Sequence, residues 1–522
     1  MAEPSYDEVP YEGRAIPASA PAALLMTARA HGGPRGTLEG ARVLELGCGD
    51  GANLLPLAFH HPDWLLVGVD ASARAIAVAE ESARALELSN VRFVHADVAR
   101  FTPEGEQDYV VAHGLYSWID AERRAALRRI VRRTLAPTGL AYVSFNAQPA
   151  WGVRGRVRDV LARGPGDLAS ARRRTAALLE LLGDPQHDWA VLLRHELERA
   201  AEAPDAYLAH EYLAADNDGF WLGDVVRDFE REGMRYVGDA TFDRPEGFVQ
   251  PELRERARQL EGGPIVGSDP ADCYVVPLSI AEEERIDLLA YRQLRAAVFA
   301  RDDSTFEAPA GIELLDEARV ASVVRALGDP FDPSPGVEEP FAGPRGSEVH
   351  VSGALSKMAL LVLARDYPKG YRLSELCAIA AGLLSQQRIT PEPDARDRLR
   401  AGLWALARHL EIELRLEAPA LRTTPGERPI ATALTRHEAA SRPALTTALH
   451  SALPIEPVDR AIVAWLDGTR SRSEIAGELV RAVDSGALSL EGAPSGAARL
   501  GPLLEAKVEQ TITTLGWWGL AG

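Results

Sequence analysis

The chain has 522 residues, of which 46% are hydrophobic and 25% charged, a composition typical of a globular protein with several domains. Its formal net charge of −19 disfavours a broad grip on nucleic-acid phosphates and docking on an anionic membrane. The three cysteines, Cys48, Cys273 and Cys377, form no CxxC pair and no disulfide framework, which indicates a reducing cytoplasm and no structural zinc.

The first residues, MAEPSYDEVPYEGR, are acidic and polar and lack the basic and apolar regions of a secretory signal. No apolar run reaches the ~18 residues that span a bilayer. We therefore expect a cytoplasmic protein with no membrane span and no nucleic-acid partner. Tyr6 and Tyr11 flank the stiff Pro10, and we expect this segment to close over a bound ligand as a lid. A disordered terminus is the alternative.

Between residues 41 and 147, short apolar runs alternate with helical patterns. The runs are RVLELG, WLLVGVD, VRFVHAD, DYVVAHG and LAYVSFN, and stretches such as SARAIAVAEESARALEL separate them. This alternation predicts right-handed βαβ units around a buried parallel sheet. The predicted fold class is therefore α/β, with a Rossmann-like doubly wound sheet followed by mostly helical, winged-helix-like domains.

The chain beyond this pattern is mostly helical. An Arg-rich helical insertion is predicted near 153–205, and the runs MRYVGDATF and QLRAAVFA are predicted to complete the same sheet. The stretch from 328 to 347 is rich in Pro, Gly and acidic residues and predicts a linker. The predicted domains are residues 1–305, a helical or winged-helix middle domain over 306–420, and a winged-helix-like domain over 421–522.

The stretch VLELGCGDGAN, from Val43 to Asn53, predicts a strand that breaks into a glycine-rich turn and then a helix. Gly47, Gly49 and Ala52 fit the dinucleotide-binding pattern G-x-G-x-x-A. A glycine pattern alone is weak support for any one cofactor, because a tight turn after a strand uses the same residues. The flanking residues decide which cofactor the turn suits.

Carboxylates follow three successive predicted strands. Glu45, Asp70 and Asp97 end these strands, and Asp50 lies inside the glycine turn. Asp70 is placed to accept the ribose hydroxyls and Asp97 the exocyclic amine of adenine. These acids would repel the pyrophosphate of NAD, whereas they suit S-adenosylmethionine, which has no phosphate and carries a sulfonium and an amino group. The alternative for each acid is a helix N-cap.

The series ELGCGDG…GVD…HADV resembles the class I S-adenosylmethionine-dependent methyltransferases. No metal is expected in such a site. Cys48 lies between two glycines, where small size explains it better than reactivity. The residues expected to contact the cofactor are Glu45, Gly47, Cys48, Gly49, Gly51, Asn53, Asp70, Ala71, Asp97, Val98 and His113.

Further stretches resemble one bacterial subfamily, the protein-lysine methyltransferases with a methyltransferase regulatory domain. They are YDEVPY, DYVVAHGLYSWI, LAYVSFNAQPAWGVRGRVRD, HEYLAADNDGFWLGDVVRDFEREGMRYVGDA and LDGTRSRSEI. The resemblance implies N-methylation of amines such as protein lysine side chains. The chain differs from the subfamily at Ile16, Ser19, Gln148 and Ala150, near the expected substrate entrance. These differences keep a small-molecule acceptor, such as a natural product, as an alternative.

Aromatic and amide side chains are the candidates for handling an amine. A lysine amine must lose its proton before it attacks, and an apolar, aromatic surrounding lowers its pKa. For each aromatic the alternative is packing on the sheet edge. Asn146 would orient the amine or shape the turn before Pro149, and His113 would act as a base or, as we favour, fix its loop or touch the cofactor. The candidate catalytic residues are Tyr6, Tyr11, Tyr116, Trp118, Asn146 and Trp151.

The C-terminal stretch PVDRAIVAWLDGTRSRSEIAGEL predicts a small winged-helix module. Because the chain is acidic, we expect this module to contact proteins or to form a homodimer rather than to read DNA. A non-catalytic regulator that uses the cofactor as a signal is a third hypothesis. It is motivated by the size of the helical C-terminal half, which exceeds what methyl transfer needs.

Overall fold

The computed structural model of the chain describes residues 13–163, 167–241, 260, 278–344, 346–421, 424–488 and 497–522. Four residues named above, Tyr6, Pro10, Tyr11 and Cys273, lie outside these ranges, and so does the expected lid that the first three would form. None of the described helices has the length and apolar character needed to cross a membrane. Within the same ranges, no group of three or more His, Cys, Asp or Glu side chains could hold a metal ion.

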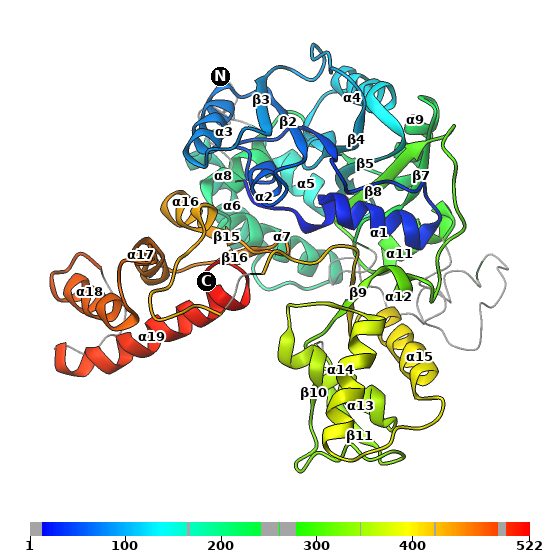
Figure 1. The fold of residues 1–522 in the computed structure, drawn as a ribbon. Helices are drawn as coiled ribbons and strands as arrows, with labels where there is room; N and C mark the ends of the chain where they lie inside the picture. The colour runs from blue at the N-terminus through cyan, green and yellow to red at the C-terminus, as the bar shows by residue number, and fades with distance from the viewer. Residues whose placement is uncertain are drawn as a thin grey trace.

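A mixed eight-stranded sheet forms the first part of the molecule (Figure 1). Its order is β3-β2-β1-β4-β5-β8-β7, and β6 pairs with the end of β5. Strands β1 to β5 run parallel, whereas β8 runs antiparallel to both of its neighbours. The strands are β1 (Arg42–Leu46), β2 (Leu65–Asp70), β3 (Val91–His95), β4 (Gln107–Ala112), β5 (Leu135–Ala147), β6 (Gly219–Phe220), β7 (Met234–Asp239) and β8 (Leu294–Arg301).

Helices cover both faces of this sheet, so the predicted doubly wound α/β fold is confirmed. Side-chain caps start several of them; for example, Ser72 accepts a hydrogen bond from the backbone of Ala75, and Asp120 one from Arg123. The short and long helices of this part are η1 (Pro17–Ser19), α1 (Pro21–His31), α2 (Leu54–His60), α3 (Ala73–Ala85), η2 (Tyr116–Trp118), α4 (Ala121–Thr134), α9 (Leu222–Glu230) and α11 (Ile280–Leu289).

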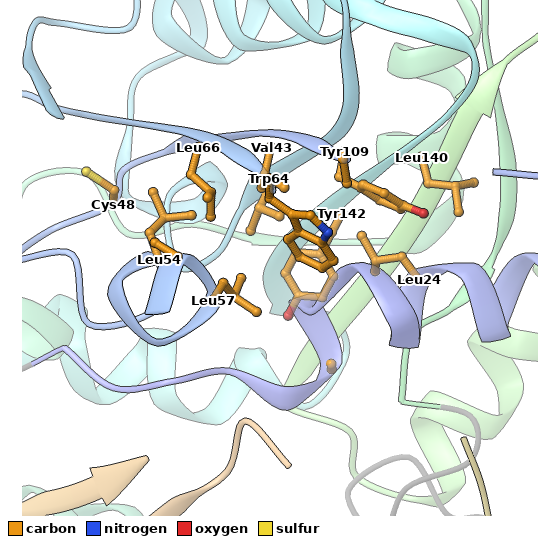
Figure 2. Packing of buried hydrophobic residues seen from close by; sticks show 14 of the residues in the cluster. Leu24, Val43, Cys48, Leu54, Leu57, Trp64, Leu66, Tyr109, Leu140 and Tyr142 are labelled. Carbon is orange, nitrogen blue, oxygen red and sulfur yellow. The ribbon is translucent and has the colours of Figure 1, made fainter. Parts of the chain in front are cut away.

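Alternate residues of each central strand enter two different cores. Val43 of β1 packs with α1, α2 and α3 on one face, while the next residue, Leu44, packs with α4 and α9 on the other. Figure 2 shows the first of these cores, with Leu24 and Trp64 over the sheet. The strands are therefore buried on both sides, which explains their nearly continuous apolar runs.

The predicted helical insertion follows β5 and has its own small core. Arg154 is buried there and pairs with Glu196 and Glu211 at 2.7 and 2.8 Å. The elements of the insertion are α5 (Trp151–Leu161), α6 (Leu168–Leu182), α7 (Asp188–Glu202), α8 (Asp205–Leu208) and the π-helical turn η3 (Ala209–Leu213).

The middle part of the chain packs helices against two three-stranded sheets, ordered β10-β11-β12 and β13-β9-β14. The elements are α12 (Leu314–Glu317), β9 (Arg319–Ala321), β10 (Arg325–Ala326), β11 (Glu339–Ala342), β12 (Glu348–Val351), α13 (Ala354–Asp366), β13 (Tyr371–Arg372), α14 (Leu373–Gln386), α15 (Ala395–Arg408) and β14 (Glu413–Arg415).

The prediction of a linker over 328–347 is wrong. Strand β11 lies inside it, and Phe341 of that strand is fully buried in the core of α13, α14 and α15. Lys357 of α13 donates hydrogen bonds to the carbonyls of Asp332, Ser334 and Val337. The Pro- and Gly-rich composition therefore reflects tight turns around a short strand rather than a connection between domains.

The C-terminal part forms a further core around the long helix α19. Figure 1 shows these helices grouped apart from α13, α14 and α15. The predicted domain boundaries stay predictions. The elements here are α16 (Ala433–Ser441), β15 (Ala444–Thr446), β16 (Ala452–Pro454), α17 (Pro457–Trp465), α18 (Arg472–Asp484) and α19 (Ala497–Trp517).

Candidate active site

The turn between β1 and α2 carries three glycines with positive φ. Gly47, Gly49 and Gly51 have φ values of 77°, 53° and 76°, which side chains rarely allow. A Cβ added at Gly51 would lie 2.8 Å from the ring of Phe93, whereas one added at Gly49 would meet no atom of the described residues within 4 Å. Packing therefore requires a glycine at position 51. The open space over Gly49 is what a ligand cradle needs.

Cys48 belongs to the core beneath the loop and lies at the edge of the cluster drawn in Figure 2. It is 5% exposed, and burial raises the pKa of its thiol. A Cβ added at Gly68 of β2 would lie 2.8 Å from its sulfur, so little room is left for a larger side chain. This placement favours the interpretation that small size, rather than reactivity, explains Cys48.

Asp70, the last residue of β2, ties the glycine turn to the second strand. One carboxylate oxygen accepts a hydrogen bond from the backbone of Gly49 at 2.9 Å, and the other accepts one from Ser72 at 2.8 Å. Each oxygen has a further lone pair. The carboxylate is thus fixed beside the open space over Gly49 and can still accept two ribose hydroxyls.

Glu45 is buried at the end of β1, directly beneath the turn. One of its oxygens accepts a hydrogen bond of 3.0 Å from Asn53, while Oε2 is buried and has no hydrogen-bond partner among the described residues. Burial raises the pKa of Glu45 to about 8; the bond from Asn53 opposes this shift, and Asp70 and Asp50 reinforce it. A buried carboxyl with a free acceptor fits a cationic ligand group.

Asn53 connects this carboxyl to the N-terminal segment. Its amide nitrogen donates to Ser19 and to Glu45, both at 3.0 Å, and its oxygen accepts from the backbone of Ile16 at 2.9 Å. His450, from the C-terminal part of the chain, lies 2.8 Å from the same oxygen. The amide thus joins three parts of the chain: the N-terminal segment 16–19, the turn after β1, and the C-terminal part.

Asp97 follows β3 and is committed to protein partners. Arg123 donates to its carboxylate at 2.7 Å, and the backbone of Ala99 donates at 2.8 Å. The bond from Arg123 holds the pKa of Asp97 below its usual value. The expected contact with adenine would have to share this carboxylate with Arg123. Of the neighbouring predicted residues, Ala71 is exposed and Val98 is 9% exposed.

His113 and Gly114 follow β4 at the same edge of the sheet. The ring of His113 lies 2.9 Å from the hydroxyl of Tyr142, and the backbone of Gly114 donates to Ser144 at 2.8 Å. Burial lowers the pKa of His113 to about 4, so the imidazole is neutral near pH 7. A neutral ring would not repel a sulfonium. Gly114 has a positive φ, and a Cβ there would lie more than 4 Å from every neighbour that the structure describes.

Asn146 lies near the end of β5, held by residues from two neighbouring loops. Its backbone donates to the hydroxyl of Ser117 at 2.8 Å, and its amide donates to Asn217 at 2.7 Å. The side chain is 4% exposed. These bonds fix its orientation beside η2, where Trp118 is half-buried.

Tyr116 and Trp151 lie in the packed interior rather than on an open surface. Tyr116 is 1% exposed, packs among phenylalanine rings and accepts a hydrogen bond from Arg128 at 2.9 Å. Trp151 is 4% exposed, and the guanidinium of Arg154 lies 5.5 Å from its ring. For both residues this placement favours the packing alternative over contact with a substrate. Trp118 is the predicted aromatic with partial exposure.

Family models match three parts of the chain. They are a methyltransferase domain over residues 43–139, a predicted methyltransferase regulatory domain over 204–301, and the PKMT C-terminal winged helix domain over 427–520. Among solved structures, the fold is similar to PKMT2 from Rickettsia typhi, with a TM-score of 0.82 over 98% of this chain and 100% of that one, at 20% identity. The same protein in complex with AdoHcy gives 0.81.

Two curated proteins extend the comparison. Uncharacterized protein RP789 of Rickettsia prowazekii is 28% identical over 57% of this chain, which spans about half of that protein (53%). Trans-aconitate 2-methyltransferase of Methylobacterium radiotolerans is 31% identical over 32% of this chain and 67% of that enzyme. The chain belongs to the S-adenosylmethionine-dependent methyltransferases.

The residues present fit the cofactor of this methyltransferase family. The free oxygen of Glu45 suits its amino group or sulfonium, and the space over Gly49 and Gly114 admits a ligand against bare backbone. The contacts bring together Glu45, Gly49, Asn53 and Asp70, four of the residues that the sequence predicts to bind the cofactor; their contacts with the cofactor stay predictions. Sequence reasoning missed His450 and Ser19 as neighbours of Asn53, because no local pattern signals contacts across such separations.

Proposed function

We propose that this methyltransferase transfers the methyl group of S-adenosylmethionine to the side-chain amine of a lysine in a protein substrate. The observation that carries this proposal is the match of residues 427–520 to the winged helix of the PKMT family, behind a methyltransferase and a regulatory domain. The similarity in fold to PKMT2 over 98% of the chain supports the same arrangement.

The proposed chemistry is an in-line displacement. When bound, S-adenosylmethionine supplies a methyl group that its sulfonium makes electrophilic. The work of the chain is alignment, because the attacking nitrogen must stand within about 3–3.5 Å of that carbon. Asp70 and the glycine turn would hold one end of the cofactor, and the carboxyl of Glu45 would balance its positive charge.

The acceptor amine must be neutral and oriented. Ser117 and Asn217 fix Asn146 by hydrogen bonds. Its amide oxygen would therefore accept a hydrogen bond from the amine with no change in the position of the Asn146 side chain. Trp118 is the half-buried member of the candidate aromatic residues that the structure describes, and its ring would shield the amine from water. His113 is neutral because burial holds its pKa near 4, so it would add no positive charge beside the amine. A poor base of this kind suits a reaction in which desolvation, rather than a strong base, frees the lone pair.

A cavity of about 790 Å³ supports a bulky acceptor. Pro17 and Ala20, on either side of Ser19, line it together with His450, so it borders the network around Asn53. Three carboxyl groups also line it: Glu411, Glu413 and Glu417. Arg408 and Arg415 line it as well, and Arg415 pairs with Glu413, so a protein segment bound there would meet charges of both signs.

A labelling experiment tests the proposal. The protein is incubated with S-adenosylmethionine labelled in the methyl group and with a cell lysate, and the products are divided into protein and small molecules. We expect label in discrete protein bands that is lost when excess S-adenosylhomocysteine is added. Label confined to the small-molecule fraction would refute a protein acceptor.

A small-molecule acceptor is the second candidate. It is favoured by the 31% identity to trans-aconitate 2-methyltransferase, whose acceptor is a small acid by its name. The changes at Ile16 and Ser19 lie in the segment that contacts Asn53 and so border the same site. We also propose that the protein works in the cytoplasm and has no nucleic-acid partner. The net charge of −19 supports the second of these proposals.

A further inference from the structure

An arginine in the C-terminal part of the chain binds the glycine turn between β1 and α2. Arg442 follows α16 and is 9% exposed. Its guanidinium pairs with the carboxylate of Asp50 at 2.8 Å, donates to the carbonyl of the same residue at 3.3 Å, and donates to the carbonyl of Gly13 at 3.4 Å. Asp50 lies between Gly49 and Gly51, so the arginine binds the turn between two of its flexible points.

A second contact holds the other end of the same turn. His450, in the connection between β15 and β16, lies 2.8 Å from the side-chain oxygen of Asn53. Residues 50 and 53 are thus both bonded to one small hairpin region of the C-terminal core, across almost 400 residues of sequence. Neither bond involves Asp70 or Glu45, the two carboxyl groups that are proposed to contact the cofactor.

We propose that Arg442 is a positioning residue for the cofactor turn, through which the C-terminal winged-helix core sets the affinity for the cofactor. A turn with three glycines has many accessible conformations, and a ligand that needs one of them must bear the cost of ordering it. The ion pair with Arg442 orders the turn beforehand. It also offsets the charge of Asp50, which stands near Glu45 and Asp70.

The inference rests on the proposed cofactor site but not on the acceptor. A purely structural role for Arg442, joining two cores, would change thermal stability and leave the dissociation constant of a bound ligand unaltered. A positioning role changes the dissociation constant for S-adenosylhomocysteine and the KM for S-adenosylmethionine, while kcat at saturating cofactor is kept. These readouts separate the two roles.

Isothermal titration of the full chain with S-adenosylhomocysteine tests the proposal. For Arg442→Ala we expect affinity to fall roughly tenfold, the loss typical of one charge-assisted contact. Asp50→Asn should weaken binding through the same pair, and the double variant should be no weaker than the worse single one. Arg442→Lys should bind with intermediate affinity, because lysine keeps the charge but not the fork of donors.

Arg470→Ala is the matched control, since that arginine pairs with Asp467 on the surface of the C-terminal part, within one short stretch of chain. It should bind like the wild type. Wild-type affinity in Arg442→Ala, or additive losses in the double variant, would overturn the inference and leave the proposed function standing. If Arg442→Ala does not fold, Arg442→Lys and Asp50→Asn decide by the same criteria.

Discussion

Asn53 donates a hydrogen bond of 3.0 Å to Glu45, and it donates to one carboxyl oxygen only. Within the part of the chain that the structure describes, the other oxygen of Glu45 is buried without a partner, and burial raises the pKa of this carboxyl to about 8. The carboxyl of Glu45 is therefore mostly protonated near pH 7, and it should release its proton when a cationic ligand binds beside it. The first prediction uses this property.

Cofactor binding should release a proton. Below pH 8 the carboxyl of Glu45 is mostly protonated in the free protein, whereas a bound sulfonium and amino group favour the carboxylate. Affinity for S-adenosylmethionine should therefore rise as the pH rises from about 6.5 toward 8. Titration calorimetry near pH 7 in buffers of different ionisation enthalpy measures the release, which we expect to approach one proton.

Glu45→Gln is the control for this prediction. Glutamine keeps the oxygen that accepts from Asn53 but cannot ionise. The variant should bind more weakly and release no proton, and equal release from variant and wild type would contradict the role of Glu45. Because the folded-state pKa is raised, Glu45 stabilises the fold below its unfolded-state value, near 4.5, and loses that contribution as the pH rises through about 8.

Asp70→Ala should weaken cofactor binding by roughly 5- to 150-fold, the range for stranding hydrogen-bond donors without an acceptor. The substitution removes the acceptor for the backbone of Gly49 as well as the one proposed for the ribose. Asp63→Ala is the control. Asp63 lies before β2, the strand that Asp70 ends, and its carboxylate likewise accepts a hydrogen bond from a backbone amide, that of Gly40. Titration with S-adenosylhomocysteine compares them; equal affinities would mean that Asp70 only shapes the turn.

Gly49→Ala tests the cradle over the glycine turn. Gly49 and Gly105 have φ values of 53° and 68°, and a Cβ at either position would meet nothing within 4 Å. Alanine should therefore strain both sites alike, by about 1 kcal/mol, and lower the melting temperature to a similar extent. Only Gly49→Ala should lose affinity for S-adenosylhomocysteine. Unchanged affinity in that variant would show that the cofactor does not use the space that the described residues leave over Gly49.

Tyr116→Phe should leave turnover unchanged. The hydroxyl accepts from Arg128 inside a core of aromatic rings, so its loss should cost about 1 kcal/mol of folding free energy. Trp118→Ala should instead lower kcat, because the half-buried side chain of Trp118 lies in η2, beside Asn146, where the acceptor amine is proposed to bind. Chemical denaturation and steady-state rates on the same samples separate these effects. A loss of turnover beyond tenfold in Tyr116→Phe would assign that tyrosine to the chemistry.

The sequence predicts the parts of this molecule that depend on neighbours along the chain. Apolar alternation places β1 to β5, and the acids at strand ends single out Asp70 and Glu45, which the structure places beside the glycine turn. The same periodicity reports burial but not direction, so the antiparallel course of β8 is not predictable from it. Composition also misassigns the segment around Phe341, since turns and linkers share proline and glycine.

Contacts between distant segments are the part that the sequence cannot supply. Arg442 and His450 belong to a hairpin region with no motif of its own, and their bonds to Asp50 and Asn53 depend on how separate cores pack. Tyr116 is a related case, because its place in the aromatic core follows from rings on β6 and α9.

The central claim is that a lysine side chain in a protein receives the methyl group. Complete hydrolysis of protein labelled from the methyl-labelled cofactor, followed by amino-acid analysis, tests this claim most directly. The account predicts that the label elutes with Nε-methylated lysine. Label released as volatile methanol by mild base, as from carboxyl methyl esters, or label eluting with any other amino acid, would contradict it.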